Sequence, residues 1–145
     1  MGGKPQQDAP GEIQSLILVD TSVWIEFFKD TKGPETRFLI RAIEDEEDLC
    51  TCGPVLQEVL QGIRIDADHA RVREYLSSLV YLPVGRATYL DAAALYRRAR
   101  KKGETVRKPV DCVIASCAIS QSVFLLERDG DFDSIARYST LRLCL

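Results

Sequence analysis

The sequence predicts an α/β fold with a mainly parallel central sheet of five strands. Two observations carry this prediction: short apolar runs of strand length recur along the chain, and amphipathic stretches of helical length separate them. A run that is apolar at every position is typical of a strand buried on both faces. Alternation of such strands with amphipathic helices indicates a layered α/β fold.

The five predicted strands are short and lie between these helices. The run Leu16-Ile17-Leu18-Val19 has no polar interruption, and Val123-Phe124-Leu125-Leu126 repeats its character. The other three predicted strands are less uniformly apolar, and each lies between two helical segments or after the last one. The predicted strands lie at 16–19, 49–52, 81–84, 123–126 and 141–145.

Helix start and stop signals fit the intervening segments. Prolines at 34, 54 and 109 suit the first turn of three helices, and Gly103 suits the end of a long one. Asp68 is expected to cap a further helix. The acidic run at 44–48 reads as a solvated helix end and a tight turn. The predicted helices are 22–28, 34 to the acidic run, 53–63, 68–79, 88–102, 109–121 and 133–138.

The composition is that of a single folded domain. The 145 residues are 46% hydrophobic and 28% charged, which argues against wholesale disorder. The net charge of −3 gives the protein as a whole no attraction for nucleic acid, although a local basic surface is compatible with it. The five cysteines lack the paired spacings of a zinc site and are expected to be reduced, mostly buried thiols.

The first 15 residues are polar and rich in glycine and proline. We expect a flexible leader at 1–15 and a folded domain at 16–145.

The N-terminal region lacks the basic and then apolar order of a signal peptide, and no apolar run approaches the ~20 residues of a membrane span. We therefore expect a cytoplasmic protein without a membrane partner.

Acidic residues stand where the predicted strands end and where helices begin. Asp20 directly follows the first strand, and Asp129 and Asp131 follow the fourth. Glu58 lies one turn into the helix that Pro54 opens, and Asp111 follows Pro109. Because ligand sites of open α/β sheets lie beyond the carboxyl ends of the strands, these side chains are expected to converge.

Converging carboxylates repel one another and are costly to bury, so they indicate a bound cation. Oxygen ligands favour Mg²⁺ or Mn²⁺ over zinc. Such an ion binds phosphate oxygens and lowers the pKa of a water nucleophile, which is the chemistry of phosphodiester hydrolysis. Taken singly, each acid also has an ordinary structural interpretation: a turn former or helix cap, a solvated helix residue, or a helix-dipole partner.

Four local sequences, in order, resemble those of PIN-domain ribonucleases, in particular VapC-type toxins of toxin–antitoxin pairs. They are Val19-Asp20-Thr21-Ser22-Val23-Trp24-Ile25, Glu58-Val59-Leu60-Gln61-Gly62, Asp111-Cys112-Val113-Ile114-Ala115 and Arg128-Asp129-Gly130-Asp131-Phe132. The resemblance covers residues 16–145. It implies a three-layer PIN-like fold with a five-stranded parallel sheet, RNA cleavage that depends on Mg²⁺ or Mn²⁺, a homodimer, and a small VapB-type antitoxin.

The resemblance also implies roles for individual residues. Four of them match the acidic quartet of the family: Asp20, Glu58, Asp111 and Asp129. Asp131 matches an additional acid, counted here among the metal ligands, and Ser22 matches a supporting hydroxyl beside the first acid. The leader departs from the family pattern, in which the chain usually starts almost at the first strand.

A basic segment precedes the helix that carries Asp111. Seven of the nineteen Lys and Arg residues lie between positions 97 and 108. Arg107 and Lys108 are expected to flank a scissile phosphate, since guanidinium binds phosphate through two hydrogen bonds. Arg97 and Arg98 are further candidates for RNA binding, although cations also stabilise helix C-termini without any ligand.

Other acidic α/β classes fit the sequence less well. A haloacid-dehalogenase-type phosphatase needs a second Asp where this chain has Ser22, and a receiver domain needs a lysine after a late strand, whereas no lysine follows Lys108. The sequence therefore favours a metal-dependent endoribonuclease. The resemblance to VapC-type toxins implies structured RNA, of the tRNA or rRNA class, as the substrate, although no residue here selects one RNA. The alternative is a non-catalytic PIN-like domain that binds a partner or RNA.

Overall fold

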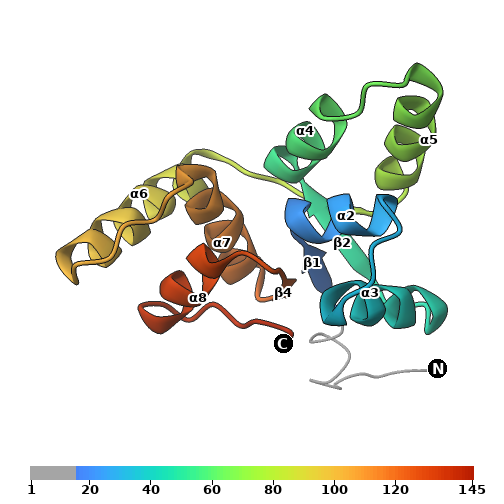
Figure 1. Ribbon diagram of the computed structural model, residues 1–145. Helices are drawn as coiled ribbons and strands as arrows, with labels where there is room; N and C mark the ends of the chain where they lie inside the picture. The colour runs from blue at the N-terminus through green and yellow to red at the C-terminus, as the bar shows by residue number, and fades with distance from the viewer. Residues whose placement is uncertain (1–15) are drawn as a thin grey trace, which may run out of the picture.

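The computed structural model describes residues 16–145 as alternating strands and helices (Figure 1). The predicted leader at 1–15 lies outside the described residues. The strands are β1 (Ile17–Val19), β2 (Leu49–Cys52), β3 (Val80–Leu82) and β4 (Phe124–Leu126). The helices are α2 (Thr21–Phe28), α3 (Pro34–Glu44), α4 (Gly53–Gln61), α5 (Asp66–Ser77), α6 (Arg86–Lys101), α7 (Pro109–Gln121) and α8 (Gly130–Arg137).

The four strands form one parallel sheet in the order β3-β2-β1-β4. β1 lies inside the sheet, where Leu18 is level with Cys50 of β2 and with Leu125 of β4. All three residues of β1 are buried, as expected for a strand covered on both faces. The carboxyl ends of the strands therefore meet at one edge of the sheet.

The order of the strands places the helices in two layers. The chain moves in one direction from β1 to β2 to β3 and then returns across the sheet to β4. Because crossovers between parallel strands are right-handed, the connections on the outward path and on the return cover opposite faces. Figure 1 shows α2–α5 to one side of the strands and α6–α8 to the other. The expected three-layer α/β architecture is confirmed.

The prediction of five strands is wrong by one strand. The segment at 141–145 makes a single parallel bridge, between Leu143 and Leu125. Leu125 donates its N–H to the Arg142 carbonyl at 2.9 Å and accepts from the Cys144 N–H at 3.0 Å. A strand needs consecutive pairs, and the paired backbone groups here surround Leu125 alone. The described sheet therefore has four strands.

Several boundaries also differ from the predictions. α5 begins at Asp66 rather than at Asp68, because the extended residue before the helix is Ile65. α8 begins at Gly130 rather than at 133, because Asp129 caps it by accepting the Asp131 N–H. The predicted end of the long helix is close: α6 ends at Lys101, and Gly103 adopts a positive φ of 83° just beyond it.

The core supports the sheet from both faces. Its largest fully buried side chains include Trp24 of α2 and Phe132 of α8. Four of the five cysteines are buried and the fifth is partly exposed, all as free thiols, as expected. Within residues 16–145 no helix combines the length and the apolar content that a membrane crossing requires.

Candidate active site

The strand order reverses between β1 and β4, so the crevice at their carboxyl ends is the expected place for a ligand. Asp20 lies at this point, since its N–H donates to the Leu126 carbonyl at 2.9 Å. Its carboxylate caps α2 and accepts from the Ser22 N–H at 3.1 Å and from the Ser22 hydroxyl at 2.6 Å. The predicted hydroxyl at Ser22 therefore orients a buried Asp20.

Glu58 reaches the same crevice from α4. Its Oε1 accepts a hydrogen bond from the Thr21 hydroxyl at 2.8 Å. Thr21 is the first residue of α2, directly after Asp20, and the sequence analysis did not assign it a role. In the sequence, the position of Thr21 directly after Asp20 could have suggested a role at the site, but nothing there indicates a bond to Glu58.

Asp111 lies in the first turn of α7 and is buried. Its Oδ2 has no hydrogen-bond partner among the described residues. A buried carboxylate oxygen without a donor is costly, so it marks a position that a ligand can satisfy.

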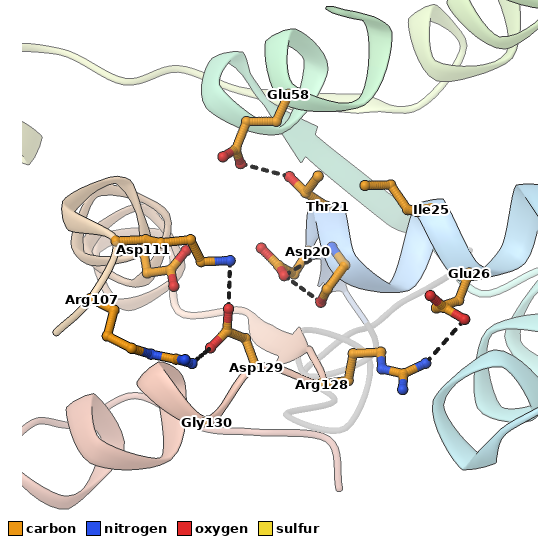
Figure 2. Close-up of a pocket in the computed structure, with 12 residues that line it drawn as sticks. Asp20, Thr21, Ile25, Glu26, Glu58, Arg107, Asp111, Arg128, Asp129 and Gly130 are labelled. Carbon is orange, nitrogen blue, oxygen red and sulfur yellow. Dashed lines mark hydrogen bonds and ion pairs between the residues drawn. The ribbon is translucent and has the colours of Figure 1, made fainter. Parts of the chain in front are cut away.

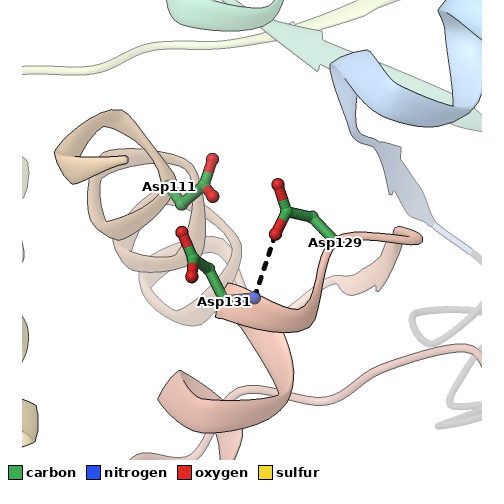
Figure 3. Close-up of side chains that lie close together, drawn as sticks. All are labelled: Asp111, Asp129 and Asp131. Atoms are coloured by element: carbon green, nitrogen blue, oxygen red, sulfur yellow. Dashed lines mark hydrogen bonds between the residues drawn. The ribbon is translucent and has the colours of Figure 1, made fainter. Parts of the chain in front are cut away.

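Asp129 and Asp131 come from the turn between β4 and α8. Asp129 Oδ1 accepts the Asp131 N–H at 3.0 Å, and Asp131 Oδ2 accepts the Lys108 N–H at 3.1 Å. Carboxylate oxygens of Asp111, Asp129 and Asp131 lie within 4.8 Å of one another (Figure 3). Three acids from two separate segments therefore form one cluster.

All four residues of the predicted quartet line one cavity of about 540 Å³ (Figure 2). Thr21, Ser22, Arg107 and Lys108 also line it. Asp131 does not, and its two carboxylate oxygens already accept hydrogen bonds from Arg107 and Lys108. The structure thus brings together the quartet and Ser22 at one cavity, and Asp131 lies beside Asp111 and Asp129. Metal ligation by Asp131 stays a prediction.

Two of the four predicted RNA-binding residues lie at this cavity. Arg107 is 3.4 Å from Oδ1 of both Asp129 and Asp131, and Lys108 Nζ is 2.5 Å from Asp129 Oδ2. Arg97 and Arg98 of α6 do not line it, and Arg98 instead donates to the Tyr138 carbonyl at 2.8 Å. RNA binding by Arg97 and Arg98 stays a prediction.

Glu127 is a further buried acid beside the site, and it is not among the predicted site residues. It directly follows β4, is buried, and accepts the Asp129 N–H on its Oε1 at 2.9 Å. Burial, with a smaller contribution from the charge of Asp133, raises the pKa of Glu127 to about 7. Its place directly after a predicted strand, two residues before Asp129, was the available signal.

Comparison with known proteins agrees with this geometry. Residues 17–138 match the PIN domain family. The chain is 39% identical over 130 residues to ribonuclease VapC11 of Mycobacterium tuberculosis and to a VapC ribonuclease of Mycobacterium bovis, covering 88% of this chain and 96% of each relative. This chain belongs to the PIN-domain family. Its similarity to the two mycobacterial proteins places it with the VapC-type members.

Solved structures share the fold of this PIN domain. The structure of VapBC-1 from nontypeable Haemophilus influenzae matches with a TM-score of 0.69 and 18% identity, over 88% of this chain and 96% of that one. VapBC2 from Rickettsia felis, bound to a DNA fragment from its promoter, matches with a TM-score of 0.68 and 16% identity over the same shares. At these identities the likeness supports the fold.

The pKa values of the carboxyl groups in this PIN domain are shifted in different directions. Burial raises the pKa of Asp20, although its hydrogen bonds from Ser22 oppose the shift. Burial and the nearby charge of Asp20 raise the pKa of Asp111 to about 8. Burial acts in the same direction on Asp129, but Lys108, the Asp131 amide and Arg107 outweigh it and hold the pKa of Asp129 below its ordinary value.

These residues fit a divalent metal ion. Asp20 and Asp111 are buried carboxyl groups, and Asp111 Oδ2 has no donor among the described residues. A cation beside the cluster would remove the repulsion and satisfy that oxygen. The donors are all oxygen atoms, which suits Mg²⁺ or Mn²⁺ more than zinc.

Proposed function

We propose that this PIN domain is a divalent-metal-dependent endoribonuclease and the toxin of a VapBC-type toxin–antitoxin pair. The observation that carries the proposal is the convergence of Asp20, Glu58, Asp111 and Asp129 on one cavity with cations at its rim. The identity to VapC ribonucleases supports RNA as the substrate. A non-catalytic PIN-like domain would be expected to lack one or more of the four acidic residues, whereas this chain has all four.

The residues divide the work by position. Asp20, Glu58, Asp111 and Asp129 would hold Mg²⁺ or Mn²⁺, with Asp131 supporting Asp129. When bound there, such an ion would supply a water of lowered pKa as the nucleophile and a positive charge beside the scissile phosphate. Ser22 and Thr21 fix the orientation of Asp20 and Glu58 through their hydroxyls. Arg107 and Lys108, at the rim, would bind the phosphates of a structured RNA such as tRNA or rRNA.

Removal of the metal tests the proposal. RNA cleavage should stop in EDTA and return with Mg²⁺ or Mn²⁺. Asp20→Asn keeps the shape of the side chain but weakens ligation, so it should abolish cleavage while circular dichroism shows an intact fold. Sequencing of RNA 5′ ends after expression of wild type and Asp20→Asn would identify the cleaved RNA. Full cleavage by Asp20→Asn protein in EDTA would contradict the proposal.

The proposal includes two protein partners. The solved structures with this fold include VapBC complexes, which supports a VapB-type antitoxin as a partner of this chain. A basic residue of that antitoxin would cover the acidic site. Expression of this chain alone should slow growth, and coexpression of the cognate antitoxin should restore it. Unimpaired growth with the chain alone would count against the toxin role.

A second copy of the chain is the other partner. Large apolar side chains are exposed on β3 and near the start of α6, and their burial against a second copy would favour association. They are Val80, Tyr81, Tyr89 and Leu90. Sedimentation equilibrium should give a dimer, and charged substitutions at Tyr89 and Leu90 should give a monomer.

A further inference from the structure

Asp129 has one carboxylate oxygen that is held by a single partner. Its Oδ1 accepts the Asp131 N–H at 3.0 Å and an Arg107 N–H at 3.4 Å. Its Oδ2 contacts the ammonium of Lys108, at 2.5 Å. A divalent cation that binds Asp129 through Oδ2 would therefore lie close to the Lys108 ammonium and be repelled by it.

Two hydrogen bonds hold the backbone of Lys108, whereas its side chain is half exposed. The Lys108 N–H donates to Asp131 Oδ2 at 3.1 Å, and its carbonyl accepts the Asp111 N–H at 2.9 Å in the first turn of α7. The Lys108 side chain is 52% exposed, while that of Asp129 is 10% exposed. The ammonium is thus carried on a flexible four-carbon stem from a fixed point beside the cluster.

The ammonium also lies in the field of the other acids. Asp20 and Asp111 line the same cavity as Lys108 and Asp129, so their carboxylates also attract the ammonium. The Lys108 ammonium thus reduces the repulsion between the carboxylates, which is also what a bound divalent ion would do.

We propose that the Lys108 ammonium is the built-in counter-ion of Asp129, that it competes with the divalent metal for Oδ2, and that metal binding releases it to the phosphate of the substrate. This inference rests on the proposed function, because it assumes that the acidic cluster holds a metal ion. It assigns Lys108 two opposite effects: it weakens metal binding and strengthens phosphate binding. A residue that merely supports the site would favour both.

Calorimetric titration of Mn²⁺ in the absence of RNA tests the competition. Lys108→Met keeps the length of the side chain without its charge, and it should bind Mn²⁺ roughly three- to fivefold more tightly than wild type. Lys108→Gln provides a second neutral variant. Lys32→Met is the matched control, since it removes a lysine that pairs with Asp30 at 3.8 Å on the loop before α3; its Mn²⁺ affinity should equal that of wild type.

Titration of inorganic phosphate into Mg²⁺-saturated protein tests the release. Lys108→Met should bind phosphate roughly two- to fivefold more weakly than wild type. Unchanged phosphate affinity would overturn the release, and unchanged or weaker Mn²⁺ affinity in both neutral variants would overturn the competition while the proposed function stands. Failure of wild type and Lys108→Met alike to bind Mn²⁺ would overturn the metal site and this inference together.

Discussion

Thr21 and Glu58 are joined by a hydrogen bond of 2.8 Å, although they are separated by 37 positions in the sequence. The bond connects the first residue of α2 to the second turn of α4, across the adjacent ends of β1 and β2. It orients Glu58 toward the cavity that Asp20 also lines (Figure 2). Partners that orient a metal ligand commonly contribute to metal affinity themselves.

Replacement of Thr21 by valine should therefore weaken the metal site. Thr21→Val keeps the branched shape but removes the donor to Glu58, and Mn²⁺ affinity should fall roughly tenfold. Thr21→Ser keeps a hydroxyl and should retain most of the affinity. Calorimetric titration of the three proteins gives the comparison; equal affinity in wild type and Thr21→Val would remove Thr21 from the site.

Asp129 and Asp131 should respond differently to the loss of charge. Asp129 lines the cavity and has an oxygen held only by Lys108, so Asp129→Asn should cost metal affinity and cleavage together, by about 100-fold or more. Asp131 binds the Lys108 amide behind the cavity, so Asp131→Asn should cost less affinity and chiefly stability. Calorimetric metal titration, cleavage rates and thermal melting of both variants measure these effects. Normal metal affinity and cleavage in Asp129→Asn, with both lost in Asp131→Asn, would reverse the two assignments.

The stability of the metal-free protein should fall as pH rises. The pKa of Asp111 is about 8 in the folded protein against an ordinary 3.8, so the folded state binds the proton more tightly than the unfolded state does. The contribution of Asp111 to the free energy of unfolding is therefore complete below about pH 4 and is lost progressively as the pH rises to about 8. Asp111→Asn should flatten this slope and gain about 1–3 kcal/mol at pH 8. Denaturant unfolding in EDTA at several pH values measures both effects.

Bound metal should reverse this trend. Ligation requires ionised carboxylates, so Mn²⁺ affinity should increase as the pH rises toward the pKa of Asp111, which is about 8. The stabilisation by Mn²⁺ should be much smaller in Asp111→Asn. A metal-induced shift of the melting temperature that is the same in both proteins would contradict the assignment of Asp111.

Glu127 should act on the site through the backbone of Asp129. Glu127→Ala leaves the Asp129 N–H without its acceptor at 2.9 Å, and Mn²⁺ affinity should fall roughly tenfold. Glu127→Gln retains an oxygen in that place and should restore the affinity. If Gln were as poor as Ala, the charge of Glu127 rather than its hydrogen bond would be what the site needs.

Arg107 should contribute to RNA binding. Arg107→Ala removes a cation at the rim of the cavity, so RNA affinity should fall and the salt dependence of log Kd should flatten by about one unit of slope. Metal binding should persist, because the contacts of Arg107 with Asp129 Oδ1 and Asp131 Oδ1 are long, at 3.4 Å each. Binding curves for RNA at several salt concentrations measure the slope, and an unchanged slope would assign Arg107 a structural role.

Local patterns predicted most of the fold. The unbroken apolar run of β1 marked a strand buried on both faces, and Pro34, Pro54 and Pro109 marked helix starts that the structure confirms. The fifth strand was wrong, because an apolar segment at 141–145 does not reveal how many of its residues find a partner. The start of α8 was also misplaced, since Asp129 resembles any residue of an acidic turn until its carboxylate is seen to cap the helix.

The sequence by itself determined which chemistry is available: four acids at strand ends and helix starts, a hydroxyl at Ser22, and cations at 107 and 108. These signals are local, because capping, turn formation and burial patterns act over a few residues. Only the tertiary structure decided which of these groups meet. The order β3-β2-β1-β4 brings Thr21 to Glu58 and Lys108 to Asp129, and it leaves Arg98 bound to the Tyr138 carbonyl, away from the cavity. Contacts between residues this far apart depend on how strands pair and helices pack, which no short stretch of sequence encodes.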